Sequence, residues 1–221
     1  MTSIEALTDD VQIRTLEPSD LSRVVEIHMA AFPASALTML GAEAVRRYYA
    51  WLLTGPHKCF ASGASPGADL MGFCFAGVFN GALSGFLEQN RAYLFRRLLR
   101  RPWLSANPIF RDRIALGFRT LRRFGGQSRT AINVPTNQTP EAAPPFAILG
   151  IAVHPDSHGQ GIGRALMFDA EQTARRYKFK EMQLTVQPDN HRAISFYESL
   201  SWQKTLIQDD WRGEMKKALG G

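Results

Sequence analysis

The 221-residue sequence predicts a globular protein built from both β-strands and α-helices. Its composition, 45% hydrophobic and 21% charged, is sufficient for a buried core and atypical of disordered chains. Along the chain, short apolar runs typical of strands alternate with segments of helical periodicity. The length suits one large domain, or an ordinary domain of about 150 residues with an elaboration.

The N-terminal part predicts a strand, two helices and a hairpin. Residues 11–16 form the expected strand, and a helix with Ser19 or Asp20 as N-cap follows and ends near Phe32-Pro33. Residues 41–53 have the apolar spacing of a second helix. Residues 59–61 and 70–78 are expected to be the hairpin strands, on either side of a turn-rich segment at 62–67.

The segment 79–145 has an unusual charge. It holds eleven arginines against Glu88, Asp112 and Glu141, a net charge of +8, whereas the whole chain carries +6. Two amphipathic helices are expected at 86–101 and 109–124, before a proline-rich linker at 136–145. We expect a single domain over 1–221 that contains this basic helical insert.

Three interpretations of the insert compete. It forms a lid or a homodimer surface whose arginines are solvated, or it meets an anionic membrane surface or a lipid-linked acceptor. In the third interpretation it meets a phosphorylated acceptor or nucleic acid, and nucleic acid ranks last because no recognised binding motif accompanies the charge.

The remaining composition favours a cytoplasmic protein, either free or peripheral to a membrane. Cys59 and Cys74 lie in apolar runs, which predicts buried reduced thiols. The acidic N-terminus lacks the apolar stretch of a secretion signal. Residues 70–87 are uncharged, but their glycines favour a strand and turn over a membrane-spanning helix.

The segment 146–202 carries the chemistry. A strand at 146–153 runs into a glycine-rich turn and a helix at 164–177, an arrangement in which backbone N–H groups and the helix dipole favour phosphate oxygens. The turn has neither the spacing of a Rossmann fingerprint nor the lysine of a P-loop. A second strand at 182–186 is followed by a helix that begins near Asn190.

Together these two halves resemble the GNAT superfamily of acyl-CoA-dependent N-acetyltransferases. The positions that match its motifs are Gly161, Gly163, Asn190, Ala193, Phe196 and Tyr197. Two positions depart from them: His158 stands where Gln or Arg is usual, and Ser201-Trp202 replaces Gly-Phe. The resemblance covers residues 146–202 well and the N-terminal part by element order only.

The resemblance implies an α/β fold with a mixed, mostly antiparallel central sheet flanked by helices. Its strands at 146–153 and 182–186 would splay apart and admit the pantetheine arm of acetyl-CoA, with no metal required. The residues implied to bind this cofactor are Ile151, Ala152, Val153, His158, Gly159, Gln160, Gly161, Ile162, Gly163, Arg164, Asn190, Ala193 and Tyr197. The amide near Ala152 would also polarise the thioester carbonyl.

The implied reaction is direct attack of a neutral amine on the thioester, with Tyr197 as the general acid that protonates the leaving sulfur. The alternative for Tyr197 is a packing role in the core. The base is not fixed by spacing: the candidates are His28, Glu26, Glu141 and a chain of waters. His28 is preferred, because in this layout the end of the first helix borders the acceptor side of the cleft.

The sequence therefore predicts an N-acetyltransferase that acts on a primary amine of a small molecule, such as an amino sugar or a lipid-linked intermediate. Two alternatives stay open. One is acetylation of a protein N-terminus or lysine, and the other is a non-catalytic acyl-CoA-binding module.

Overall fold

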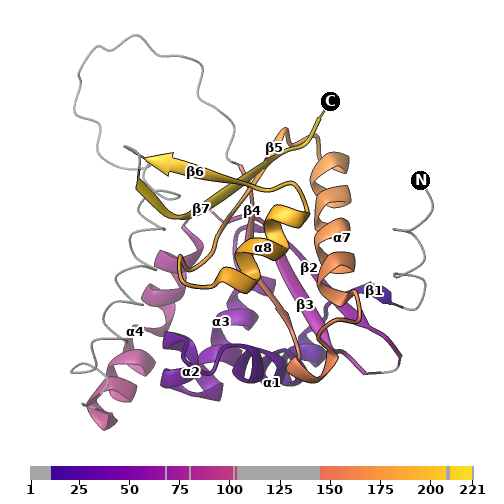
Figure 1. Cartoon of the computed structure of the whole chain (residues 1–221). Coiled ribbons are helices and arrows are strands. Elements are labelled where there is room, and N and C mark those ends of the chain that lie inside the picture. The colour runs from indigo at the N-terminus through magenta and orange to yellow at the C-terminus, as the bar shows by residue number, and fades with distance from the viewer. Residues whose placement is uncertain are drawn as a thin grey trace, which may run out of the picture.

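A seven-stranded sheet in the order β1-β2-β3-β4-β5-β7-β6 forms the centre of the protein (Figure 1). The computed structural model describes residues 11–67, 69–79, 81–101, 103, 145–207 and 210–220. Strands β4 and β5 pair in parallel, whereas the other neighbouring strands pair antiparallel. The expected mixed, mostly antiparallel sheet flanked by helices is confirmed.

The N-terminal elements follow the predicted order, with one addition. They are β1 (Gln12–Thr15), a 3₁₀ turn (Pro18–Asp20), α1 (Leu21–Ala31), α2 (Ala36–Leu40) and α3 (Ala42–Thr54). The sequence did not predict α2, a single short helix that begins where Ser35 Oγ accepts the Thr38 N–H at 3.1 Å. The Asp20 carboxylate pairs with Arg14 and does not cap α1.

The hairpin of β2 (Lys58–Ser65) and β3 (Gly72–Val78) is longer than expected. The turn predicted at 62–67 is wrong for residues 62–65, which pair with β1, while residues 62–64 also pair with β3. Gly63 has a packing reason: a Cβ there would lie 2.5 Å from Leu70 Cδ1 and 2.7 Å from Leu16 Cδ2. The glycine permits close approach of side chains in the sheet and does not mark a turn.

The later elements are α4 (Ala82–Arg100), β4 (Phe146–Val153), a 3₁₀ turn (Pro155–Ser157), α7 (Ile162–Arg176), β5 (Glu181–Thr185), α8 (His191–Ser199), β6 (Gln203–Ile207) and β7 (Asp210–Ala218). The helix α4 begins at Ala82, before the predicted start at 86. The hairpin β6–β7 was not predicted. The helix expected at 109–124 and residues 136–144 of the expected linker lie outside the described residues.

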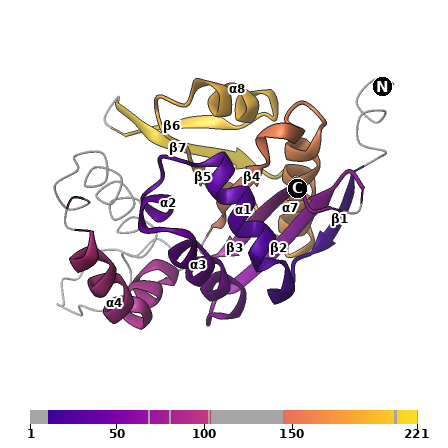
Figure 2. The same cartoon turned by 90° about the horizontal axis from the view of Figure 1, so that it is seen from below.

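Two hydrophobic cores cover the two faces of the sheet. Helices α7 and α8 bury Leu166, Ile194 and Tyr197 on one face, and α1 and α3 bury Ile27 and Tyr49 on the other. Figure 2 shows α1 and α3 from below, with α8 on the far side of the strands. Cys59 and Cys74 are both free thiols, as predicted, but only Cys74 is buried and Cys59 is partly buried. Within the described part of the chain, no helix has the length and hydropathy needed to cross a membrane.

Candidate active site

The parallel strands β4 and β5 stay paired over only part of their length. Their pairing runs from Phe146 and Met182 to Ile148 and Leu184. Beyond Ile148, β4 continues to Val153 beside β3 alone, whereas β5 stays paired with β7. The β5 edge of β4 therefore presents backbone groups without a strand partner, which is the splay expected from the sequence. Such groups are suited to hydrogen-bond the amides of an extended ligand.

A β-bulge interrupts β4 where the splay begins. Phe75 pairs with Gly150 and Ala76 with Ile148, so Leu149 is the extra residue. Leu149 packs in the α1–α3 core, and a Cβ on Gly150 would point to the same side, 3.5 Å from Tyr49 Oη. Two consecutive residues thus face one side of the sheet. No local feature of the sequence predicts this bulge.

The turn after β4 leads into the N-terminus of α7. Gly159 and Gly161 have φ angles of 84° and 77°, a left-handed conformation that glycine adopts without strain. Residues 158–160 are exposed, and the first amides of α7 have no carbonyl partners within the helix. This turn can therefore accept an anionic group, as its sequence suggested.

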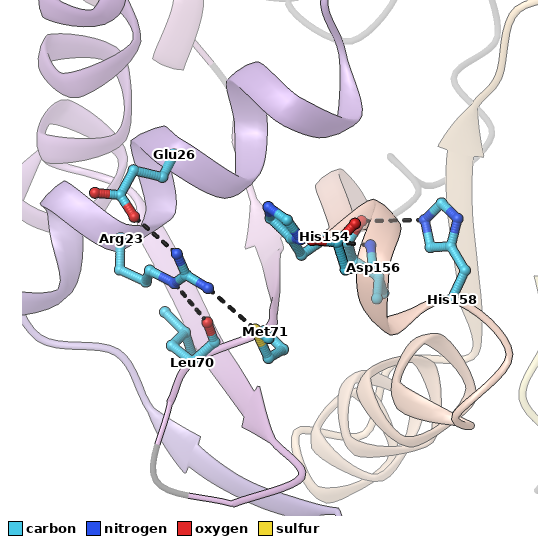
Figure 3. Close-up of polar contacts among 8 residues, drawn as sticks. Arg23, Glu26, Leu70, Met71, His154, Asp156 and His158 are labelled. Atoms are coloured by element: carbon cyan, nitrogen blue, oxygen red, sulfur yellow. Dashed lines mark hydrogen bonds and ion pairs between the residues drawn. The ribbon is translucent and has the colours of Figure 1, made fainter.

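The side chain of His158 points back to β4. Its Nε2 lies 3.2 Å from the Val153 carbonyl oxygen, so Nε2 carries the hydrogen and donates it (Figure 3). This contact fixes the turn against the last residue of the strand. The role of His158 in holding a cofactor stays a prediction.

Contacts from α1 brace the same region from the other side. Arg23 donates from Nε to the Leu70 carbonyl at 2.9 Å, and its Nη1 pairs with Glu26 at 2.8 Å. Figure 3 shows Arg23 reaching Leu70 and Met71 in the connection between β2 and β3. The His154 N–H donates to the Met71 carbonyl at 2.7 Å, so this connection links α1 to the turn after β4. Glu26, a candidate base, is thus engaged in an exposed ion pair. Glu141, another candidate, lies outside the described residues.

Helix α8 positions Tyr197. Asn190 begins the helix by accepting the Ala193 N–H at 3.1 Å, a capping role that by itself explains the asparagine. Tyr197 is 9% exposed and packs beside Phe196 and Trp202, and its hydroxyl has no hydrogen-bond partner among the described residues. Burial raises the pKa of Tyr197, and the nearby Cys74 thiol adds to this effect. The phenol therefore keeps its proton at neutral pH.

The start of α7 and α8 are in contact. A Cβ on Gly163 would lie 3.4 Å from the ring of Phe196, the neighbour of Tyr197. The small residue at 163 thus lets α8 pack closely on the first turn of α7. Residues 151–153, 158–164 and Tyr197 therefore lie in one region, and the ligand role of each stays a prediction.

His28 lies on the opposite face of the sheet and is 5% exposed. Its Nδ1 is 2.9 Å from Tyr49 Oη and its Nε2 is 3.1 Å from Ser35 Oγ. Burial lowers the pKa of His28 to about 4, so the ring is neutral near pH 7. The predicted base is therefore buried and fully hydrogen-bonded, and its role stays a prediction.

Tyr49 and Ser35 were missed as partners of His28. The sequence placed Tyr49 among the apolar positions of a helix, and nothing in its spacing distinguishes it from a core tyrosine. Only the packing of α3 against α1 brings its hydroxyl to the histidine.

Comparison with known proteins agrees with this geometry. Residues 109–202 match the acetyltransferase (GNAT) family. A mycothiol acetyltransferase of Geodermatophilus obscurus is 32% identical over 90 residues, which cover 41% of this chain and 29% of that relative. The match therefore spans less than a third of the relative's length.

Solved structures with the same fold include two N-acetyltransferases. One, from Thermoplasma acidophilum in complex with coenzyme A, has a TM-score of 0.54 at 14% identity, covering 94% of this chain and 98% of the other. The second is the ribosomal-protein-S18-alanine N-acetyltransferase of Escherichia coli, with a TM-score of 0.54 at 16% identity, covering 96% and 95%. At these identities the likeness establishes the fold.

Proposed function

We propose that the chain belongs to the GNAT acetyltransferase family and transfers an acetyl group from acetyl-CoA to a primary amine of a small molecule. One observation carries the proposal. The part of β4 beyond Ile148 pairs with β3 alone, and it leads into the glycine turn at the start of α7. Backbone N–H and C=O groups of β4 that lack a strand partner are thus followed along the chain by the free N–H groups at the N-terminus of α7.

The donor side follows from that path. The backbone of residues 151–153 would bind the amides of the pantetheine arm, and residues 158–164 would hold the pyrophosphate at the positive end of the α7 dipole. These groups fit an anionic, amide-bearing ligand, and bound acetyl-CoA would supply the activated acetyl group. The arm would then run back along β4 from the turn, which puts the reactive end near Gly150.

Two groups serve the chemistry in this arrangement. The amide near Ala152 would donate a hydrogen bond to the thioester oxygen as charge develops there. Tyr197 would donate its proton to the departing sulfur, a role suited to a buried phenol whose raised pKa keeps it protonated. The proton of the attacking amine must leave by another route.

The acceptor class is the finer part of the proposal. The partial match to a mycothiol acetyltransferase favours a small-molecule amine over a protein, because mycothiol is a small molecule. An amino sugar and a lipid-linked intermediate are both within this class. A protein N-terminus or lysine is the rival acceptor, and a non-catalytic acyl-CoA-binding module is the rival function.

The exposed basic and large apolar residues of α4, which we call its outer face, are Arg91, Phe95, Arg96, Leu99 and Arg100. Of the three interpretations of the basic segment, they favour a membrane partner. Two arginines have structural roles: Arg97 donates to the Leu40 carbonyl at 2.7 Å and Arg101 to the Met39 carbonyl at 3.0 Å, both at the end of α2. They are not merely solvated. The apolar side chains of Phe95, Leu99 and Trp103 are exposed, at 63%, 64% and 62%, in the same stretch as the exposed Arg91, Arg96 and Arg100. A basic surface with large apolar side chains suits anionic lipid headgroups.

Thiol release tests the proposed function. The purified protein would be incubated with acetyl-CoA and with panels of amino sugars, small amines, and peptides with free N-termini or lysines. We expect free CoA and an acetylated small amine, identified by mass spectrometry. Acetylation of peptides alone would move the function to protein acetylation. Binding of acetyl-CoA without thiol release from any panel would leave only the acyl-CoA-binding module.

A further inference from the structure

A continuous chain of hydrogen bonds joins the side chains of Tyr49, His28, Ser35 and Thr38, and it runs from the bulge in β4 to the surface. Tyr49 Oη lies 2.9 Å from His28 Nδ1, and His28 Nε2 lies 3.1 Å from Ser35 Oγ. Ser35 Oγ in turn donates to Thr38 Oγ1 at 3.0 Å. The first two residues are buried, and the last two are partly exposed.

The hydrogen bonds fix the direction of the chain. Ser35 uses its only hydrogen on Thr38, so it must accept from His28, and Nε2 carries the imidazole hydrogen. Neutral imidazole then presents Nδ1 as an acceptor, and Tyr49 donates to it. Every donor therefore points outward, from Tyr49 towards Thr38.

The inner end of the chain lies beside the bulge. The Tyr49 hydroxyl is 3.5 Å from the place of a Cβ on Gly150, so it lies close to the backbone of that residue. Gly150 follows the last residue pairs of β4 with β5 and the extra residue Leu149. On the proposed path of the cofactor, the reactive end lies here.

We propose that Tyr49, His28, Ser35 and Thr38 form a proton relay that carries the proton of the attacking amine to solvent. The inference rests on the proposed function. The amine nitrogen loses its proton to Tyr49 Oη as the Tyr49 proton passes to His28 Nδ1. The Nε2 proton passes to Ser35 Oγ, the Ser35 proton to Thr38 Oγ1, and the Thr38 proton to water. Each side chain ends neutral, and one hydronium ion forms.

The relay suits a buried histidine. Burial lowers the pKa of His28 to about 4, so the ring would be a poor resting place for a proton but can pass one on. No charged residue is a cause of this shift, and Tyr49 from α3 is the titratable group hydrogen-bonded to the ring. This refines the predicted role of His28, which passes a proton on and does not contact the amine.

Replacing Tyr49 by Phe tests the relay, because it removes the hydroxyl and keeps the ring that packs on Phe73 and Phe75. The probes are ethylamine, which is charged at neutral pH, and 2,2,2-trifluoroethylamine, which is mainly neutral there. With ethylamine we expect turnover to fall by about tenfold or more, and with trifluoroethylamine by much less. Tyr48→Phe is the matched control on the same helix: it keeps the ring that packs on Tyr49 and removes a hydroxyl that has no hydrogen bond to the four relay residues, so it should retain wild-type turnover.

The outcomes separate the two proposals. Absence of thiol release by the wild type with every amine would contradict the proposed function. An active wild type with an unaffected Tyr49→Phe variant, or with equal losses for both amines, would overturn the relay.

Nitrogen-15 NMR of the histidine rings gives a second readout that needs no turnover. We expect His28 to carry hydrogen on Nε2 and to stay neutral well below pH 6, with its resonances assigned by loss in His28→Gln. A ring with hydrogen on Nδ1 would reverse the direction of the chain and overturn the relay.

Discussion

Tyr49 and Tyr197 approach neighbouring residues of β3 from opposite faces of the sheet. The Tyr49 ring packs on Phe73 and Phe75, whereas Tyr197 belongs to the core that contains Cys74, the residue between them. In the proposed reaction this places removal of the amine proton on one face and protonation of the sulfur on the other. The two proton transfers then do not compete for one group.

Tyr197→Phe tests the general acid. Because the hydroxyl has no hydrogen-bond partner among the described residues, its loss should leave the fold and acetyl-CoA affinity nearly unchanged. Turnover should fall by about 10²-fold or more. Steady-state kinetics and titration with acetyl-CoA measure the two effects, with Tyr177→Phe at an exposed position as the control. Unchanged turnover would assign Tyr197 to the core alone.

Stability should depend on pH through His28. Its pKa in the folded protein is about 4 against an ordinary value of 6.5, so between these values the unfolded chain binds more protons. The free energy of unfolding should therefore fall on acidification through this window, by up to about 3 kcal/mol from this group. Urea unfolding of the wild type and of His28→Gln measures it. An equal fall in the free energy of unfolding for the wild type and for His28→Gln would show that His28 is not buried as a neutral ring.

Gly77→Ala tests the register of the hairpin. Gly77 has a φ of 146°, and a Cβ there would lie 2.0 Å from the Lys58 carbonyl oxygen. We expect the free energy of unfolding to fall by about 3 kcal/mol or more. Gly67→Ala is the control, because a Cβ there meets nothing within 4 Å, and its effect should be within about 0.5 kcal/mol. Similar stabilities of the two variants in urea would contradict the pairing of β2 with β3.

The outer face of α4 should bind anionic vesicles. Co-sedimentation with phosphatidylglycerol vesicles should exceed that with phosphatidylcholine vesicles and should weaken in high salt. The double variant Phe95→Ser with Leu99→Ser should lose most of this binding. Phe168→Ser on α7 removes a side chain that is equally exposed, at 63%, and this control variant should bind the vesicles as the wild type does. Vesicle binding that is the same for both lipids, or the same in the wild type and the double variant, would contradict a membrane partner. A dimer that persists at high salt in sedimentation would favour the homodimer interpretation.

The sequence predicted the elements whose signals are local. The strand at 146–153 and the helix after it were found because an apolar run, a glycine-rich segment and an amphipathic helix follow one another. The hairpin β6–β7 was missed because its exposed positions mix polar and apolar residues without regular alternation. Gly63 was misread because a glycine that permits packing looks the same in sequence as one that turns the chain.

The candidate site was predictable on the donor side only. Its turn and α8 are contiguous motifs that resemble a known family, so Gly161, Gly163 and Tyr197 could be proposed as site residues from the sequence, and their roles stay predictions. The bulge at Leu149 depends on pairing with β3, and the contact of Tyr49 with His28 depends on the packing of two helices. Neither arises from local sequence, so only the structure reveals them.

The central claim is that the acyl donor binds to the part of β4 beyond Ile148 and to the turn before α7. Amide hydrogen exchange with and without CoA tests this claim most directly. We expect slower exchange on adding CoA in the peptides that cover residues 149–153 and 158–164, and unchanged exchange in β1 (Gln12–Thr15) at the far edge of the sheet. Protection confined to other elements, or none at saturating CoA, would contradict it.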